Sequence, residues 1–198
     1  MTRIIGGTAG GRRLETPKGQ ATRPTSDRVR EALFSAIESW CGSLDGLRFL
    51  DLYAGSGAVG LEALSRGAGV ATFVEQDRRT ASLISRNARA LGFAADVIPG
   101  SVGTVLSGAP RASYDVVFLD PPYPLPDADV DADLAALVAH GWLAADALVV
   151  VERASKRSSL TWPAGIDALR ERKYGETLLR YGHAASPAHG DHDADPGE

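Results

Sequence analysis

The chain has 198 residues, of which 44% are hydrophobic and 23% are charged, and its formal net charge is −4. This composition is typical of a globular protein and excludes a wholly disordered or collagen-like chain, and the length suits one ordinary domain. No stretch reaches the roughly 18 apolar residues that a membrane helix needs, and the N-terminus carries charges and glycines where a signal peptide is apolar. We therefore expect a cytoplasmic protein with no membrane association.

The charge is unevenly distributed along the chain. Residues 1–30 carry a net charge of +5, whereas residues 183–198 carry −4. A basic arm on an acidic body predicts that one face contacts a polyanion, although a solvated surface without a partner would explain the same charge equally well. The basic side chains of this arm are Arg3, Arg12, Arg13, Lys18, Arg23, Arg28 and Arg30.

The first predicted element is a small hairpin over residues 3–16, in which two extended segments flank a glycine-rich turn. Residues 17–24 begin and end with proline and are expected to form a linker. Apolar side chains then recur at helical spacing from Asp27 to Cys41, and Gly42 ends this predicted helix.

The central part of the chain alternates between predicted strands and helices. The predicted strands are the apolar runs near residues 47–52, 70–75, 95–98, 114–119 and 146–151. The helical stretches between them lie near residues 57–66, 77–91, 101–107 and 130–140. This alternation predicts an α/β fold with a parallel sheet. Two further runs, 168–174 and 176–182, are separated only by Gly175, which favours an antiparallel pair.

A glycine-rich turn follows the first strand of this alternation. Gly55, Gly57 and Gly60 form the pattern GxGxxG, and Glu75 ends the next strand 20 positions after Gly55. Such glycines let a nucleoside approach the backbone, and the carboxylate can accept hydrogen bonds from two ribose hydroxyls. NAD, FAD and S-adenosylmethionine all present such a ribose. Asp51 favours the last of these, because its carboxylate would repel a pyrophosphate but attract sulfonium and ammonium charges.

A second motif, Asp120-Pro121-Pro122-Tyr123, follows the fourth strand, and ligands bind at the carboxyl ends of such strands. The exocyclic amine of a base is a poor nucleophile because its lone pair is delocalised into the ring. The Asp120 carboxylate and the Pro121 carbonyl can accept its two hydrogens and direct the lone pair at a methyl group. Tyr123 offers a ring on which a flipped base can stack. Alone, the tetrapeptide could be an ordinary proline turn.

These motifs, in this order, resemble the RsmD family of bacterial 16S ribosomal RNA guanine-N2 methyltransferases. The most specific part of the match is the segment RPTSDRVREALF over residues 23–34. The resemblance implies a Rossmann-like class I methyltransferase with a seven-stranded, mostly parallel sheet, an antiparallel last strand and a small N-terminal β-hairpin extension. We expect a basic hairpin and linker over residues 1–24, the methyltransferase domain over 25–182, and an acidic disordered tail over 183–198.

The resemblance also implies roles for individual residues. Asp51, Gly55, Ser56 and Gly57 would hold the methionine end of S-adenosylmethionine, and Glu75 would hold the ribose. Thr25 would close over the pocket. The residues from Asp120 to Tyr123 would present the amine. Ser101 stands where the family usually has an acidic residue near the adenine amine, which leaves its hydroxyl and the Val102 amide as candidate adenine contacts. No metal site is expected.

The implied activity is methylation of the N2 amine of a guanine in 16S rRNA, within the small ribosomal subunit or its assembly intermediate, by a monomer. The motifs themselves do not select the base, since the acceptor pair suits adenine, cytosine or guanine. A methyltransferase core leaves no room for a separate recognition domain, so we expect the basic arm to bind RNA phosphates. Two alternatives are an NAD-dependent oxidoreductase that uses the GxGxxG turn and a non-catalytic RNA-binding assembly factor.

Overall fold

The computed structural model describes residues 2–17, 26–155 and 159–185. The strands of the main sheet are β3 (Arg48–Leu52), β4 (Val70–Glu75), β5 (Asp96–Pro99), β6 (Tyr114–Leu119), β7 (Leu143–Ala154), β8 (Ile166–Tyr174) and β9 (Thr177–Ala184). The helices are α1 (Asp27–Cys41), α2 (Ala58–Ser65), α3 (Arg78–Leu91), α4 (Val102–Leu106) and α5 (Asp127–Ala139). Each predicted strand and helix is present in the expected order, with ends that shift by a few residues.

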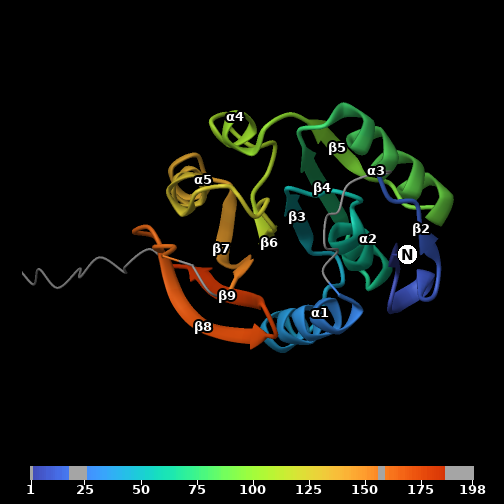
Figure 1. Ribbon diagram of the computed structural model, residues 1–198, viewed down its shortest axis with the longest axis horizontal. Coiled ribbons are helices and arrows are strands. Elements are labelled where there is room, and N and C mark those ends of the chain that lie inside the picture. The colour runs from blue at the N-terminus through green and yellow to red at the C-terminus, as the bar shows by residue number, and fades with distance from the viewer. Residues whose placement is uncertain (1, 18–25, 156–158, 186–198) are drawn as a thin grey trace, which may run out of the picture.

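The seven strands lie in the order β5-β4-β3-β6-β7-β9-β8 (Figure 1). The five strands β5, β4, β3, β6 and β7 are parallel to one another, whereas β9 is antiparallel to both β7 and β8. The predicted mostly parallel sheet with an antiparallel last strand is therefore confirmed. The chain moves outward from β3 to β5 and then returns to β6, and this reversal creates a crevice at the carboxyl ends of β3 and β6.

The sheet separates two apolar cores. Alternate strand residues such as Phe49, Phe73 and Phe118 pack with α1, α2 and α3, and the intervening residues, such as Leu50 and Val117, pack with α4 and α5. Successive side chains of a strand point to opposite faces, so a strand covered on both faces needs a continuous apolar run. No helix in the described ranges is long and apolar enough to cross a bilayer.

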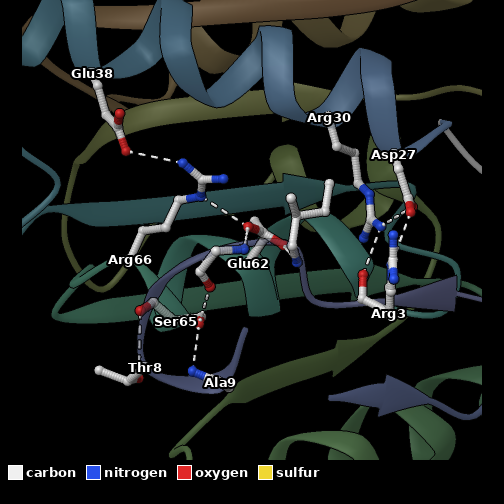
Figure 2. A network of polar contacts seen from close by, with 11 residues as sticks. Arg3, Thr8, Ala9, Asp27, Arg30, Glu38, Glu62, Ser65 and Arg66 are labelled. Atoms are coloured by element: carbon white, nitrogen blue, oxygen red, sulfur yellow. Dashed lines mark hydrogen bonds and ion pairs between the residues drawn. The ribbon is translucent and has the colours of Figure 1, made fainter. Parts of the chain in front are cut away.

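The predicted N-terminal hairpin is formed by β1 (Thr2–Arg3) and β2 (Arg13–Leu14), which pair antiparallel on either side of a 3₁₀ turn, η1 (Gly7–Ala9). Glu62 of α2 is 0% exposed and fastens this hairpin to the main sheet's helices. Its carboxylate accepts hydrogen bonds from the amides of Ile5 at 2.7 Å and Gly6 at 2.8 Å, and from Arg66 Nε at 2.8 Å (Figure 2). The hairpin, over residues 2–14, is thus a fixed part of the fold.

At the other end of the described chain, β9 continues through Ala184, where the sequence predicts the start of the tail. His183 pairs with Leu148 of β7 in this strand, so the first two residues of the expected tail belong to the sheet. The remaining part of that segment, from residue 186, lies outside the described residues.

Candidate active site

The glycine turn connects β3 to α2 and uses its glycines for two purposes. Gly55 has φ +56°, in the left-handed region that favours glycine. Gly60 lies in the first turn of α2, and a Cβ there would lie 2.3 Å from the ring of Phe73. Gly60 therefore lets α2 pack directly against β4. Gly55 shapes the turn itself and leaves the backbone of the turn open to a ligand.

Glu75, at the end of β4, is bound to this turn. Its Oε2 accepts a hydrogen bond from the Gly55 amide at 2.9 Å, and its Oε1 accepts one from the Asp77 amide at 2.8 Å. Two backbone donors fix the carboxylate, and each oxygen retains a lone pair that could accept from a ribose hydroxyl. The structure thus brings together the acid and the glycine turn that the sequence predicts to act together.

Asp51 lies beneath the turn and is only 2% exposed. Its Oδ2 accepts a hydrogen bond from the Gly60 amide at 2.9 Å. Burial, which is the largest cause, and the nearby negative charge of Glu75 together raise the pKa of Asp51 to about 8, against the lowering effect of that hydrogen bond. A positively charged ligand above the turn would offset these two carboxylates, whereas a pyrophosphate would add more negative charge. The residues therefore fit S-adenosylmethionine better than a dinucleotide.

Four carboxylates reach the same edge of the sheet. Each stands two residues after a side chain that faces α1, α2 and α3, so strand alternation places all four on that face. They are Asp51 on β3, Glu75 on β4, Asp120 after β6 and Glu152 on β7. Leu119 pairs with Val151, so the residues that come next, Asp120 and Glu152, lie side by side at the carboxyl ends of adjacent strands. Burial, together with the charges of Glu152 and Asp51, raises the pKa of Asp120 well above its ordinary value.

The segment after Asp120 holds its shape through β7. Pro121 is buried, whereas Tyr123 is 77% exposed and offers its ring to a partner. Arg153 of β7 donates from Nη2 to the Leu125 carbonyl at 2.7 Å and forms an ion pair with Asp127 at 2.7 Å. Both members of this ion pair are largely buried. Arg153 therefore fixes the loop that carries the motif.

Sequence reasoning missed Glu152 and Arg153, and it also missed a contact between Tyr53 and Asp133. Tyr53 has φ +59°, which breaks the alternation of β3. Its hydroxyl donates a hydrogen bond to Asp133 of α5, so the glycine turn is tied to the opposite face of the sheet. A visible signal for Glu152 and Arg153 is their position, since they directly follow the apolar run over residues 147–151, as Asp120 follows the apolar run over 116–119. No comparable signal points to Tyr53.

The predicted adenine contacts lie beside Glu75, whose carbonyl accepts a hydrogen bond from the Gly100 amide at 3.0 Å. Ser101 caps α4: its hydroxyl accepts from the Thr104 amide at 3.3 Å and lies 2.7 Å from the Thr104 hydroxyl. The side chain of Val102 is buried. The Ser101 hydroxyl is thus already engaged within the protein. Ser56 lies in the turn, with its carbonyl accepting from Asn87 Nδ2 at 3.2 Å.

The basic arm divides into exposed and buried members. Arg3, Arg12, Arg13 and Arg28 are exposed, and Arg12 donates to the Ala90 carbonyl at 2.6 Å. Arg30 is 1% exposed, which corrects its prediction as an RNA contact. It lies on the inward face of α1, one turn before buried Leu33 and Phe34 and two turns before buried Ile37, and it donates to the Arg3 carbonyl at 2.6 Å (Figure 2). Lys18, Arg23 and Thr25 lie outside the described residues.

Known proteins are similar to this chain in both sequence and fold. The chain matches the family described as conserved hypothetical protein 95 over residues 2–183. It is 36% identical to ribosomal RNA small subunit methyltransferase D of Escherichia coli strain K12, over 98% of this chain and 94% of that protein. The protein of the same name in Haemophilus influenzae is 35% identical, over 90% of this chain and 91% of its own length.

Solved structures share the fold of this chain. A hypothetical protein of Thermus thermophilus is 34% identical and superposes with a TM-score of 0.74, covering 91% of this chain and 98% of its own. Magnesium protoporphyrin IX methyltransferase of Synechocystis PCC 6803, solved with bound SAM, is 15% identical with a TM-score of 0.61, over 85% of this chain and 87% of its own. The second likeness shows the Rossmann-like methyltransferase fold alone. The chain therefore belongs to the conserved hypothetical protein 95 family, which is the RsmD family that its sequence resembles.

Proposed function

We propose that this protein transfers a methyl group from S-adenosylmethionine to the N2 amine of a guanine in small-subunit ribosomal RNA. The observation that carries the proposal is the meeting of the glycine turn, Glu75 and Asp120 at one edge of the sheet, in a chain whose relatives are named ribosomal RNA small subunit methyltransferase D. S-adenosylmethionine, when bound, supplies a methyl group on a sulfonium, which is a strong electrophile. The guanine assignment rests on the family.

The chain's own residues then have separate tasks. Glu75 orients the ribose through the carboxylate that the Gly55 and Asp77 amides fix. The Asp120 carboxyl and the Pro121 carbonyl accept the two amine hydrogens, so the nitrogen lone pair points at the methyl group. The displaced proton leaves after transfer, to Asp120 or to solvent. Tyr123, whose ring is exposed, stacks on the base, a contact worth roughly 1–3 kcal/mol.

Replacing Asp120 with alanine tests this assignment. We expect kcat to fall about a hundredfold or more, because the amine loses an acceptor that acts in the transition state. Binding of S-adenosylhomocysteine, measured by calorimetry, should stay close to that of the unchanged protein. The matched control is Asp167→Ala, which removes an exposed carboxylate on β8 away from the crevice. Near-normal turnover of the Asp120 variant would refute the mechanism.

The same measurements separate the two alternatives. An NAD-dependent oxidoreductase should bind NADH in calorimetry, and the buried carboxylates beneath the turn disfavour its pyrophosphate. A non-catalytic assembly factor should bind small subunits equally well with or without Asp120 and transfer no methyl group.

The physical form of the substrate is part of the proposal. We propose that the protein acts as a monomer on the small subunit or on an assembly intermediate. The test is to incubate it with labelled cofactor and undermethylated small subunits, free rRNA or DNA, and then to map the label. Label on guanine N2 of the rRNA supports the proposal, and label on DNA alone contradicts it. Light scattering of the protein in solution tests the monomer.

A further inference from the structure

A groove runs between α1 and β8. In Figure 1, β8 lies on the opposite side of α1 from the strand β2 of the N-terminal hairpin. Two hollows of about 320 and 300 Å³ form the groove, and Tyr174 lines both. The first lies between the start of α1 and the end of β8, and the second lies between the outer face of α1 and the middle of β8. The groove is therefore continuous along the helix.

The groove is basic. Its lining includes Arg28 from α1 and Arg170, Arg172 and Lys173 from β8, and no acidic side chain is among the described residues that line it. Among the acids next to lining residues, Asp27 is paired with Arg30 at 2.9 Å and Glu171 with Arg180 at 2.6 Å. The positive charge of the groove is therefore not balanced by carboxylates in its wall. Such a strip has the charge of a binding surface for phosphates.

The groove opens at the same edge of the sheet as the catalytic motif. Thr177, at the start of β9, pairs with Ala154 at the end of β7, and the Ser155 amide donates to the Glu176 carbonyl at 2.8 Å. The turn between β8 and β9 thus lies at the carboxyl end of β7, two residues beyond Glu152. Lys173 and Gly175 line the first hollow beside this turn. A strand that enters the crevice at Asp120 can continue into the groove.

We propose that this groove, defined by Arg28, Arg170, Arg172 and Lys173, binds the phosphate backbone of the RNA that flanks the target base. The identity of the polyanion rests on the proposed function, whereas the basic groove stands on the structure alone. β8 is an edge strand, and basic side chains on such strands also prevent pairing with other chains. That role would need no groove and no link to the catalytic edge, and it predicts no effect on RNA binding.

The test compares Arg172→Glu with Arg111→Glu. Both arginines are exposed and both variants change the net charge equally, but Arg111 precedes the amino end of β6, at the edge opposite Asp120. The probe is a labelled single-stranded RNA oligonucleotide, titrated at several salt concentrations. The groove variant should bind roughly five- to tenfold more weakly at low salt, and its salt slope should fall by about 0.7 or more, the value for one neutralised phosphate. The control should retain the wild-type slope.

Two further variants distinguish a loss of RNA binding from a folding defect. Arg172→Lys keeps the charge and should restore binding, and Lys173→Glu should reproduce the loss with an unchanged unfolding midpoint. Equal slopes for the groove and control variants would overturn the proposal. A loss seen only with assembled small subunits, and not with naked rRNA, would also overturn it, since a ribosomal protein would then occupy the groove. Absence of methyl transfer by the unchanged protein would refute the proposed function but leave these slopes interpretable.

Discussion

At the scale of single residues, the charge of Asp51 links cofactor binding to pH. Its carboxyl is buried beneath the glycine turn, and its pKa is raised to about 8. Near neutral pH the free protein therefore holds much of this group in the protonated form. A sulfonium and an ammonium bound above the turn would favour the ionised form instead, so binding should release a proton.

We therefore predict that S-adenosylmethionine binds more tightly as the pH rises toward about 8, with a limit of about tenfold per pH unit for one released proton. Calorimetry in buffers of different ionisation enthalpy measures the proton release directly. Asp51→Asn keeps an acceptor for the Gly60 amide and should remove most of the pH dependence. An identical pH profile in this variant would assign the release to another group.

The same carboxyl affects stability with a definite sign. The pKa of Asp51 is about 8 in the folded protein, against the ordinary value of 3.8 that applies to the unfolded chain. Between these two pH values the folded chain therefore binds more protons than the unfolded chain. The contribution of Asp51 to the free energy of unfolding is thus fully present below about pH 4 and is lost as the pH rises through 8. Asp51→Asn should make unfolding in urea less dependent on pH over this range. A steeper dependence would contradict the assignment.

At the scale of elements, a buried carboxylate, Glu62, is one of the contacts that bind the hairpin to α2. Glu62→Ala would leave the amides of Ile5 and Gly6, together with Arg66 Nε, without their acceptor (Figure 2). We expect a loss of about 2–4 kcal/mol in the free energy of unfolding, measured in urea, because buried donors left unpaired are costly. Glu38→Ala is the matched control: it also removes a partner of Arg66, but Glu38 is 43% exposed and should contribute less than about 1 kcal/mol. Equal losses would show that the hairpin is not held by Glu62.

The sequence predicts elements well where a local pattern decides the structure. The apolar runs and helical spacing locate every main strand and helix, because a doubly covered strand and an amphipathic helix each need a distinctive order of residues. The docking of the hairpin is different, since Ile5 and Glu62 are 57 positions apart. Nothing local in either segment indicates the other. Their contact becomes visible only when the helix and hairpin are folded.

At the candidate site, too, the local sequence predicts some residues and not others. The glycine turn, Glu75 and Asp120 were predictable because backbone conformation and strand position constrain them locally. Arg30 was misassigned because its positive charge suggests an exposed contact, while helical periodicity places it inward beside Leu33 and Phe34. Glu152 acquires its role through pairing between β6 and β7, which the sequence does not specify residue by residue.

At the scale of the whole molecule, acidic and basic groups are separated in space. The carboxylates gather at the crevice, whereas basic side chains lie on the hairpin at one side of the sheet and on β8 at the other (Figure 1). This arrangement attracts a cationic cofactor to the centre and a polyanion to the flanks. The net charge of −4 is an average over these regions and does not argue against an RNA partner.

The hairpin and β8 should contribute independently to RNA binding, because β2 and β8 lie on opposite sides of the molecule in Figure 1. Arg12→Gln combined with Arg13→Gln should weaken binding and reduce the salt slope by about 0.7 for each phosphate of single-stranded RNA that the arm no longer neutralises. Cofactor affinity should be unchanged, since neither side chain reaches the glycine turn. Adding Arg172→Glu should reduce the slope by the sum of the separate changes, measured by titration of one labelled RNA across a salt series. A combined change equal to that of either flank alone would mean that the RNA never contacts both at once.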